Sequence, residues 1–309
     1  MLNLLQIVIL SRDRPNFLSK TIESATNLNA SDISYEIIIS DNSESDDVNN
    51  LFKENYSKSH KISYRRRFPT ISSSSHYQLV IEELKSEYAV IFHDDDIFHP
   101  DYLLKVSSIL SNQSFSAIGC NALVFKKEIE DGFKKMHDFS QIKKFNRKKD
   151  FIRQYLVGNG GVAPFPGYLY KTEYLKKISF LDLPSGKHAD VALLASLINY
   201  GEIIWLVETL IYYRAHVGSD SASEVLVDRL SLLRYMFSNG ISRSSKSVFL
   251  FRYFYWFNWL SQKGLSTKDI SNWRYRKALK FLFFSGPRFI FSTYFIKVIL
   301  KRVKNKLTN

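Results

Sequence analysis

The chain has 309 residues, 45% hydrophobic and 24% charged, which is typical of a folded globular protein and excludes a disordered one. A single cysteine, Cys120, excludes an internal disulfide framework, and we expect the protein to act in a reducing cytoplasm. No stretch reaches the roughly 18 uninterrupted apolar residues of a transmembrane helix. The opening residues also lack the basic segment of a secretory signal.

The net charge of +13 lies almost entirely in the last 70 residues. That segment holds 15 lysines and arginines and one acid, Asp269, whereas residues 1–239 carry 28 basic and 29 acidic residues. It also holds 17 of the 46 aromatic residues, and the polar stretch "SNGISRSSKS" lies at its start. We therefore predict a charge-balanced body over residues 1–235 and a basic, aromatic, helical C-terminal extension over residues 236–309.

Strands and helices alternate through the first part of the body. Short apolar runs rich in β-branched residues predict buried strands, and apolar residues three and four positions apart predict helices. The predicted strands lie at 4–10, 35–43, 61–68 and 88–92, and the predicted helices at 11–25, 72–87 and 99–111. Asp13 or Ser11 is expected to cap the first helix, with Pro15 in its first turn.

Beyond residue 116 the pattern is less regular, with a strand at 115–125 and a helix followed by a strand between 186 and 214. Strands and helices that alternate with short connections predict a doubly wound α/β sheet. Ligands of such sheets bind at the carboxyl ends of the strands. Polar clusters at 11–14, 41–43 and 93–96 follow three predicted strands, so we expect them to converge on one crevice.

Three consecutive aspartates, Asp94, Asp95 and Asp96, follow the apolar run "YAVIF". Adjacent carboxylates repel one another, and a divalent cation that accepts oxygen ligands, Mg²⁺ or Mn²⁺, offsets that repulsion. In an extended chain the first and third side chains face the same side, which favours Asp94 and Asp96 as ligands. The alternative is that these aspartates cap the helix expected near Pro100.

Taken in order, several segments resemble family 2 glycosyltransferases, which are inverting enzymes that use nucleoside-diphosphate sugars. The similarity runs from about residue 4 to about residue 221. The segments that carry it are "VILSRDRPNFLSKTIESA", "EIIISDNSESDD", "SSSSHYQLVIEELKSEYAVIFHDDDIFHPDYL", "GKHADVALLASLINYG" and "YYRAHVGSDS". The resemblance implies a GT-A-like doubly wound mixed sheet flanked by helices, and a role in assembling bacterial surface polysaccharide such as O-antigen or capsule.

The resemblance also implies roles for individual residues. Asp96 and Asp94 are expected to bind Mn²⁺ or Mg²⁺ together with His216, which is equally consistent with a structural histidine. His93 is expected to support the ligands without binding the ion. The donor, a UDP- or dTDP-sugar, is expected to contact Asp41 at the base and Asp95 at the ribose or sugar. Arg14 is expected near the base or the diphosphate, Arg214 near the diphosphate, and Lys187 at a phosphate or the acceptor, and Ser11 is a further donor-binding candidate. Arg14 is equally consistent with a solvent-facing loop arginine.

Asp190, in "GKHADVALL", is the candidate general base that takes the proton of the acceptor hydroxyl. The family often has two acids here, but Ala189 stands at the first position, which argues against a two-carboxylate arrangement. The alternative is that Asp190 caps the following helix, and one carboxylate is able to do both. His188 lies beside it and is a further candidate for contacts with phosphate or acceptor.

The C-terminal extension mixes basic residues with Phe, Leu and Ile in patterns of helical period. Such helices bind anionic membrane surfaces, so we expect a protein peripherally associated with the inner face of the cytoplasmic membrane and a saccharide or lipid-linked acceptor. The alternative is that the extension packs on the catalytic domain. Removal of residues 240–309 separates the two readings: release from membranes supports the first, and unfolding supports the second.

Two other functions are compatible with parts of the sequence. A nucleic-acid-binding protein would use the basic, aromatic extension, but this reading leaves the three aspartates without a role, and we expect no nucleic-acid partner. A sugar nucleotidyltransferase would have a Gly-rich phosphate loop after the first strand. The segment "SRDRPNF" contains no glycine and disfavours that reaction.

Overall fold

The computed structural model describes most of the body and the first part of the C-terminal extension. The described residues are 5–30, 33–110, 114–126, 134–157, 163–184, 186–215, 226–243, 245–248 and 250–252. His216 and the greater part of the extension lie outside these ranges, so the roles expected of them stay predictions. Within the described ranges, no helix is both long enough and apolar enough to cross a membrane.

The first part of the chain forms a parallel sheet with helical connections. Its strands are β1 (Leu5–Ser11), β2 (Tyr35–Asp41), β3 (Ile62–Arg66) and β4 (Tyr88–His93). The connecting helices are α1 (Pro15–Thr26), α2 (Asp47–Asn55) and α3 (Ser73–Glu83). β1 lies between β2 and β4, and β3 extends the sheet beyond β2. The chain thus runs outward from β1 and then returns to its other side, which makes the β1–β4 boundary the switch point.

The later elements widen this sheet with strands of both directions. They are β5 (Ile97–Phe98), α4 (Tyr102–Ser107), β6 (Phe115–Phe125), β7 (Lys134–Lys135), β8 (Lys143–Phe145), α5 (Lys148–Val157), β9 (Leu169–Lys171), α6 (Thr172–Leu175), a 3₁₀ turn (Gly186–His188), α7 (Ala189–Leu197), β10 (Glu202–Arg214) and α8 (Leu226–Ser238). The strand order is β3-β2-β1-β4-β9-β6-β10-β5. β9 runs antiparallel to β4 and β6, and β5 antiparallel to β10. The predicted doubly wound mixed α/β sheet is confirmed.

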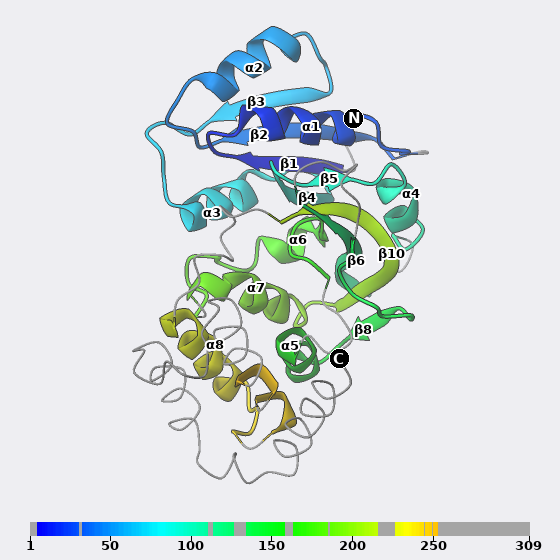
Figure 1. Cartoon of the computed structure of the whole chain (residues 1–309), viewed down its shortest axis with the longest axis vertical. Coiled ribbons are helices and arrows are strands. Elements are labelled where there is room, and N and C mark those ends of the chain that lie inside the picture. The colour runs from blue at the N-terminus through cyan, green and yellow to red at the C-terminus, as the bar shows by residue number, and fades with distance from the viewer. Residues whose placement is uncertain are drawn as a thin grey trace, which may run out of the picture.

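Successive residues of the central strands face opposite sides of the sheet, and both sides are buried. Ile7 and Ile9 pack on one side with α1, α2 and α4, whereas Val8 packs on the other with α3, α5, α7 and α8. This explains why the strands read as continuous apolar runs. In Figure 1 the parallel strands lie at one end of the molecule and α5, α7 and α8 gather at the other.

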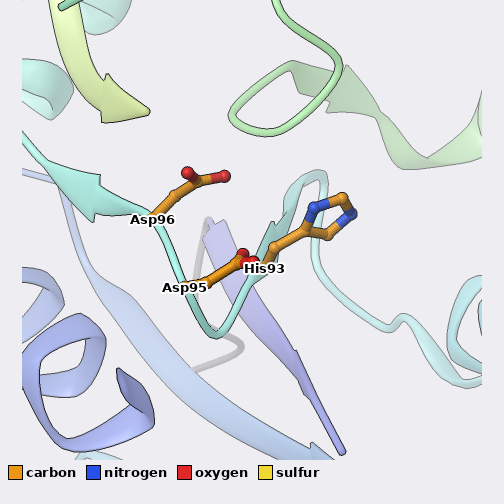
Figure 2. Close-up of side chains that lie close together, drawn as sticks. All are labelled: His93, Asp95 and Asp96. Carbon is orange, nitrogen blue, oxygen red and sulfur yellow. The ribbon is translucent and has the colours of Figure 1, made fainter. Parts of the chain in front are cut away.

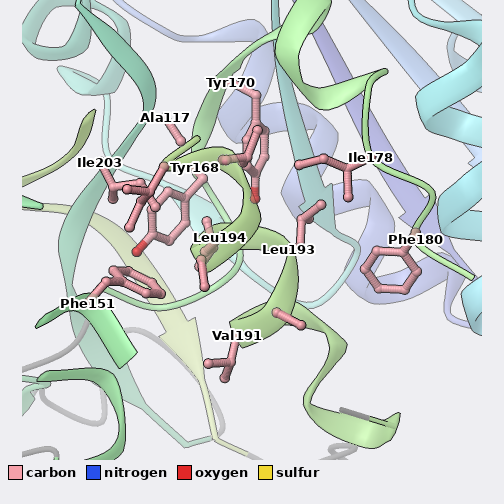
Figure 3. Close-up of a cluster of buried hydrophobic side chains, with 14 of the residues drawn as sticks. Ala117, Phe151, Tyr168, Tyr170, Ile178, Phe180, Val191, Leu193, Leu194 and Ile203 are labelled. Carbon is pink, nitrogen blue, oxygen red and sulfur yellow. The ribbon is translucent and has the colours of Figure 1, made fainter. Parts of the chain in front are cut away.

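Helix α7 is buried on all sides. Its residues from Val191 to Ala195 are fully inaccessible to solvent, as is Leu197. Figure 3 shows Val191, Leu193 and Leu194 packed among aromatic side chains that include Phe151 and Tyr168. A helix without a polar face is stable only inside a core, so the start of α7 is held firmly in place.

Some local predictions were wrong. No side chain caps α1: its N-cap is Arg14, with Pro15 following, and Asp13 adopts a positive φ of 53°. The Asp13 carboxylate instead accepts hydrogen bonds from the backbone N–H groups of Glu44 and Ser45. Helix α2 and strand β5 were not predicted, because neither segment shows a clear apolar period.

Candidate active site

The three aspartates form a tight turn between β4 and β5, called the aspartate turn (Asp94–Asp96) below. β4 ends at His93 and β5 begins at Ile97. The backbone N–H of Asp94 donates to the Leu10 carbonyl of β1 at 3.1 Å. The Thr21 hydroxyl of α1 lies 2.8 Å from the carbonyl oxygens of both Asp94 and Asp96. Two neighbouring elements therefore fix the backbone of the turn.

Asp94 ties the aspartate turn to the loop after β1. Its Oδ2 accepts hydrogen bonds from the Ser11 hydroxyl at 2.9 Å and the Arg12 backbone N–H at 3.1 Å, and its Oδ1 lies 3.3 Å from Arg14 Nη1. Burial raises the pKa of Asp94 to about 6, although the Arg14 guanidinium opposes this rise. Ser11 and Arg14 thus lie at the predicted site, where both contact Asp94.

Arg214, at the end of β10, supports the other two aspartates. Its backbone N–H donates to Asp96 Oδ1 at 2.9 Å, and its Nε donates to the Asp95 carbonyl at 3.0 Å. The guanidinium is sandwiched between the rings of Phe17 and Phe125, 4.5 and 4.4 Å from their centroids. Such cation–π contacts fix a buried guanidinium. Arg214 therefore positions the aspartate turn in addition to lining the cavity beside it.

Three ligand-bearing side chains meet at this turn: His93, Asp95 and Asp96 each offer one atom, and these atoms lie within 4.8 Å of one another. Figure 2 shows both carboxylates on the side of the turn where the His93 ring lies. Asp96 is buried, and its Oδ2 has no hydrogen-bond partner among the described residues. Burial and the neighbouring Asp95 raise the pKa of Asp96 well above its usual value. A buried, unsatisfied carboxylate oxygen beside two other ligands fits a divalent cation.

A cavity of about 350 Å³, called the polar cavity, opens above the aspartate turn. Its lining is largely charged or polar and comprises Leu10, Ser11, Arg12, Arg14, Asn42, Ser73, His76, His93, Asp94, Asp95, Asp96, Tyr213 and Arg214. Asp41 is not in this lining, because its side chain is fully buried behind the wall. Its oxygens accept hydrogen bonds from the Tyr64 hydroxyl at 2.6 Å and the Ser43 backbone N–H at 2.9 Å.

A second cavity of about 670 Å³, called the aromatic cavity, adjoins the first. Aromatic and proline side chains dominate one part of its wall, among them Tyr77, Phe165, Phe180, Phe251, Pro164 and Pro166. Lys187, His188 and Asp190 line another part. The two cavities share four lining residues, Leu10, Ser73, His93 and Tyr213. They are therefore two compartments of one depression.

Asp190 lies in the first turn of α7, and its side chain makes no cap hydrogen bond, since the N-cap is His188. Its Oδ2 instead accepts a hydrogen bond from the Tyr155 hydroxyl of α5 at 2.5 Å. This hydroxyl is buried, and burial together with the Asp190 charge raises the pKa of Tyr155 well above its usual value. Tyr155 therefore stays protonated and continues to donate to Asp190.

The aspartates do not cap α4, whose N-cap is Asp101. The expected alternation, with Asp94 and Asp96 on one side, is wrong because the chain turns here instead of running extended. Sequence reasoning placed His93 beside the aspartates but not among the metal ligands, and it did not anticipate the contact of Tyr155 with Asp190. Adjacency to the aspartates is the signal that points to His93, whereas nothing local in the sequence points to Tyr155.

Comparison with known proteins identifies the family. Solved structures with this fold include residues 1–349 of S. aureus TarS in complex with UDP-GlcNAc, which is 11% identical with a TM-score of 0.61 and covers 92% of this chain and 82% of that one. Mannosyltransferase PcManGT from Pyrobaculum calidifontis, in complex with GDP-Man and Mn²⁺, is 12% identical with a TM-score of 0.51 and covers 91% and 74%.

At these identities the likeness establishes the fold alone. A search of curated proteins finds no match. The protein-family model described as "Glycosyl transferase family 2" matches residues 6–179, which is more than half of the chain. The chain therefore belongs to glycosyl transferase family 2 and is a glycosyltransferase.

Proposed function

We propose that this protein transfers a sugar, with inversion, from a nucleoside-diphosphate donor in the polar cavity to an acceptor hydroxyl in the aromatic cavity. The proposal rests on the buried Oδ2 of Asp96, which has no hydrogen-bond partner among the described residues. Asp96 lines the polar cavity, and the adjoining aromatic cavity is lined by Asp190. One compartment offers cation ligands and arginines, and the other offers a carboxylate. These are the two kinds of group that an inverting sugar transfer needs.

Asp95 and Asp96 are the side chains placed to hold Mn²⁺ or Mg²⁺. When bound, such an ion stabilises the charge that develops on the leaving diphosphate. Arg14 and Arg214 line the same cavity, and their positive charges act on that diphosphate as well. Asp94, predicted as a ligand, has its oxygens engaged by Ser11, Arg12 and Arg14, so it holds the loop that faces the donor.

Asp190 accepts the proton of the attacking hydroxyl. Its first-turn position places it at the positive end of the α7 dipole, and Tyr155 fixes its carboxylate. Because α7 is buried all round, the carboxylate is held on a rigid support. Lys187 lines the same cavity at the preceding 3₁₀ turn and is placed to bind a phosphate of donor or acceptor.

We propose further that the donor is UDP- or dTDP-linked and that the acceptor is a saccharide or lipid-linked saccharide of a bacterial surface polysaccharide. The ligands in two structures of the same fold, UDP-GlcNAc in TarS and GDP-Man with Mn²⁺ in PcManGT, support a nucleoside-diphosphate sugar as the donor class. Asn42 lines the polar cavity where the base would bind. Asp41, expected to select the base, contacts the donor only if Tyr64 moves away from its carboxylate. Membrane association of the basic extension is part of this proposal. So is a histidine nitrogen that completes the metal site, for which the sequence offers His216 as a candidate.

A thermal-shift panel of sugar nucleotides, with and without Mn²⁺, tests the donor site. Ligand at a hundredfold excess over its Kd stabilises the folded state by about 2.7 kcal/mol, and this raises the melting temperature. We expect the correct donor to raise it only when Mn²⁺ is present, and Asp96→Asn to abolish that rise. A donor that stabilises Asp96→Asn as much as the native protein would contradict the proposed site.

A further inference from the structure

We propose that His93 is a direct ligand of the divalent ion, together with Asp95 and Asp96, and that its imidazole shifts the site's selectivity from Mg²⁺ toward transition-metal ions such as Mn²⁺. The inference rests on the proposed function, which requires an ion at the aspartate turn but leaves its nitrogen ligand and its identity open. It revises the expectation that His93 only supports the ligands.

The geometry places the imidazole within reach of the ion. His93 is the last residue of β4, directly before the turn, and one of its ring nitrogens lies within 4.8 Å of an oxygen of each partner. Ligand atoms about 2.1 Å from an ion lie roughly 3 Å apart when adjacent and roughly 4.2 Å apart when opposite. A side-chain adjustment of less than about 1 Å therefore closes the three groups around one ion.

The Asp96 carboxylate supplies an independent reason for an ion at this point. Asp96 is 1% exposed, its Oδ1 accepts from the Arg214 backbone N–H, and its Oδ2 has no partner within the described ranges. Leaving a buried acceptor unsatisfied costs about 1–3 kcal/mol, and more when it is charged. A cation shared with His93 removes that cost.

Asp94 does not compete for this role. Three donors already engage its two oxygens: the Ser11 hydroxyl, the Arg12 backbone N–H and Arg14. Breaking those bonds to bind an ion would release the loop after β1 from the aspartate turn.

Arg14 Nη1 also lies 2.8 Å from Asp95 Oδ2, but Asp95 and Asp96 each have a ligand atom within 4.8 Å of a His93 ring nitrogen, and Asp94 is not in this group. The proposed ligand set is therefore one nitrogen from His93 and one oxygen from each of these two carboxylates, Asp95 and Asp96.

That ligand set has consequences for the choice of ion. Mg²⁺ prefers an all-oxygen octahedron of carboxylates, phosphates and water. An imidazole nitrogen binds first-row transition ions more strongly than Mg²⁺, and affinity rises from Mn²⁺ through Co²⁺. The ion would also lie at the junction of the two cavities, because His93 lines both.

Pulsed electron paramagnetic resonance of Mn²⁺ bound to the full chain tests the inference directly, because it detects nitrogen bound to the ion. We expect nitrogen modulation in the native protein and its loss in His93→Gln. His60→Gln changes an exposed surface histidine and should keep the modulation. Protein made with histidine enriched in the heavy nitrogen isotope should show an altered pattern, and this reports on the native site without any variant.

Titration calorimetry with Mn²⁺ and with Mg²⁺ measures the selectivity. We expect His93→Gln to weaken Mn²⁺ binding by more than the roughly 10- to 100-fold that loss of a residue supporting the ligands costs, and Mg²⁺ binding by much less. His93→Asp, which restores an oxygen ligand, should bring the two affinities closer together.

Three results would overturn the inference: bound Mn²⁺ without nitrogen modulation, modulation that survives in His93→Gln, or no Mn²⁺ binding at all. The first two leave the proposed function standing if Asp96→Asn still abolishes Mn²⁺ binding. Modulation that disappears only in His216→Gln would assign the nitrogen to that residue instead. If Asp96→Asn binds Mn²⁺ normally, the metal site of the proposed function fails as well.

Discussion

The two cavities that meet at His93 and Tyr213 are built in opposite ways. The polar cavity has a floor of carboxylates whose positions are fixed by hydrogen bonds from β1, α1 and β10. The aromatic cavity is almost twice as large, and rings and prolines form much of its wall. On the proposed function, the polar cavity would bind the donor by charge and fixed geometry, and the aromatic cavity would bind the acceptor largely by apolar contact. The two substrates of the transfer should therefore respond differently to substitution.

The largest expected effect is at the polar cavity. Asp96→Asn keeps the shape of the side chain but removes its charge. The rate of sugar transfer should fall by at least about 10³-fold, because losing several kcal/mol of transition-state stabilisation by the metal raises the barrier by that amount. The ion-free protein should unfold at the same temperature or higher, because a buried charge has been removed. Initial rates and thermal unfolding measure both effects.

Asp101→Asn is the matched control for that substitution, since Asp101 lies in the same stretch of chain but is bonded to Asn29 at the surface. It should retain full activity. An Asp96→Asn protein that transfers sugar at the native rate would remove the polar cavity from the mechanism.

The aromatic cavity should give a second and different phenotype. Asp190→Asn removes the proton acceptor and should lower kcat by about 10²- to 10⁴-fold, with donor binding unchanged because Asp190 lines only the acceptor compartment. Equilibrium binding of the donor together with Mn²⁺ separates the two effects. Asp182→Asn changes an exposed aspartate nearby in the sequence and should leave kcat and donor binding unchanged. Loss of donor binding in Asp190→Asn would mean that the compartments are not divided as described.

A smaller effect is expected at the residue that holds Asp190. Tyr155→Phe removes the hydroxyl that donates to Asp190. It should reduce kcat by roughly tenfold, because the energy of one hydrogen bond to a charged group corresponds to about that change in rate. The KM for the donor should not change. Tyr174→Phe, which alters a tyrosine stacked on Tyr200, serves as the control. Equal rates in the two variants would contradict a positioning role for Tyr155.

The polar cavity also carries a pH-dependent contribution to stability. The His76 ring bonds to Ser40, and burial lowers the pKa of His76 from 6.5 to about 4. The folded state disfavours the protonated ring, whereas the unfolded state binds that proton below pH 6.5. The contribution of His76 to the free energy of unfolding is therefore fully present above pH 6.5 and is lost as the pH falls toward 4. The loss amounts to roughly 2 kcal/mol at pH 5.

Urea unfolding of the native protein and of His76→Gln at pH 7 and pH 5 measures this contribution. The variant should lose less stability between the two pH values than the native protein. An equal loss in both proteins would show that other groups titrate in this range.

The first half of the fold was predictable because its signals are local. Each buried strand, such as β1 or β4, is one uninterrupted apolar run in the sequence. Polar residues that follow such runs meet at one edge of a parallel sheet. The approximate location of Ser11, Arg14 and the aspartates followed from that rule alone. The family resemblance added the segment around Asp190, on the far side of the depression.

What could not be predicted depends on tertiary structure. The tight turn at Asp94 reverses the side-chain alternation expected of an extended chain and brings His93 into the ligand group. Asp41 lies behind the cavity wall because Tyr64, on the neighbouring strand β3, covers it. The contact between Tyr155 and Asp190 joins helices 35 residues apart, and no pattern in the sequence indicates it.

Diffraction from crystals soaked with Mn²⁺ and a nucleoside diphosphate shows whether the aspartate turn binds the ion, because the anomalous signal of Mn²⁺ gives its position. We expect an ion bonded to Asp96, with the diphosphate in the polar cavity beside Arg14 and Arg214. An ion and nucleotide bound away from the aspartate turn would contradict this expectation.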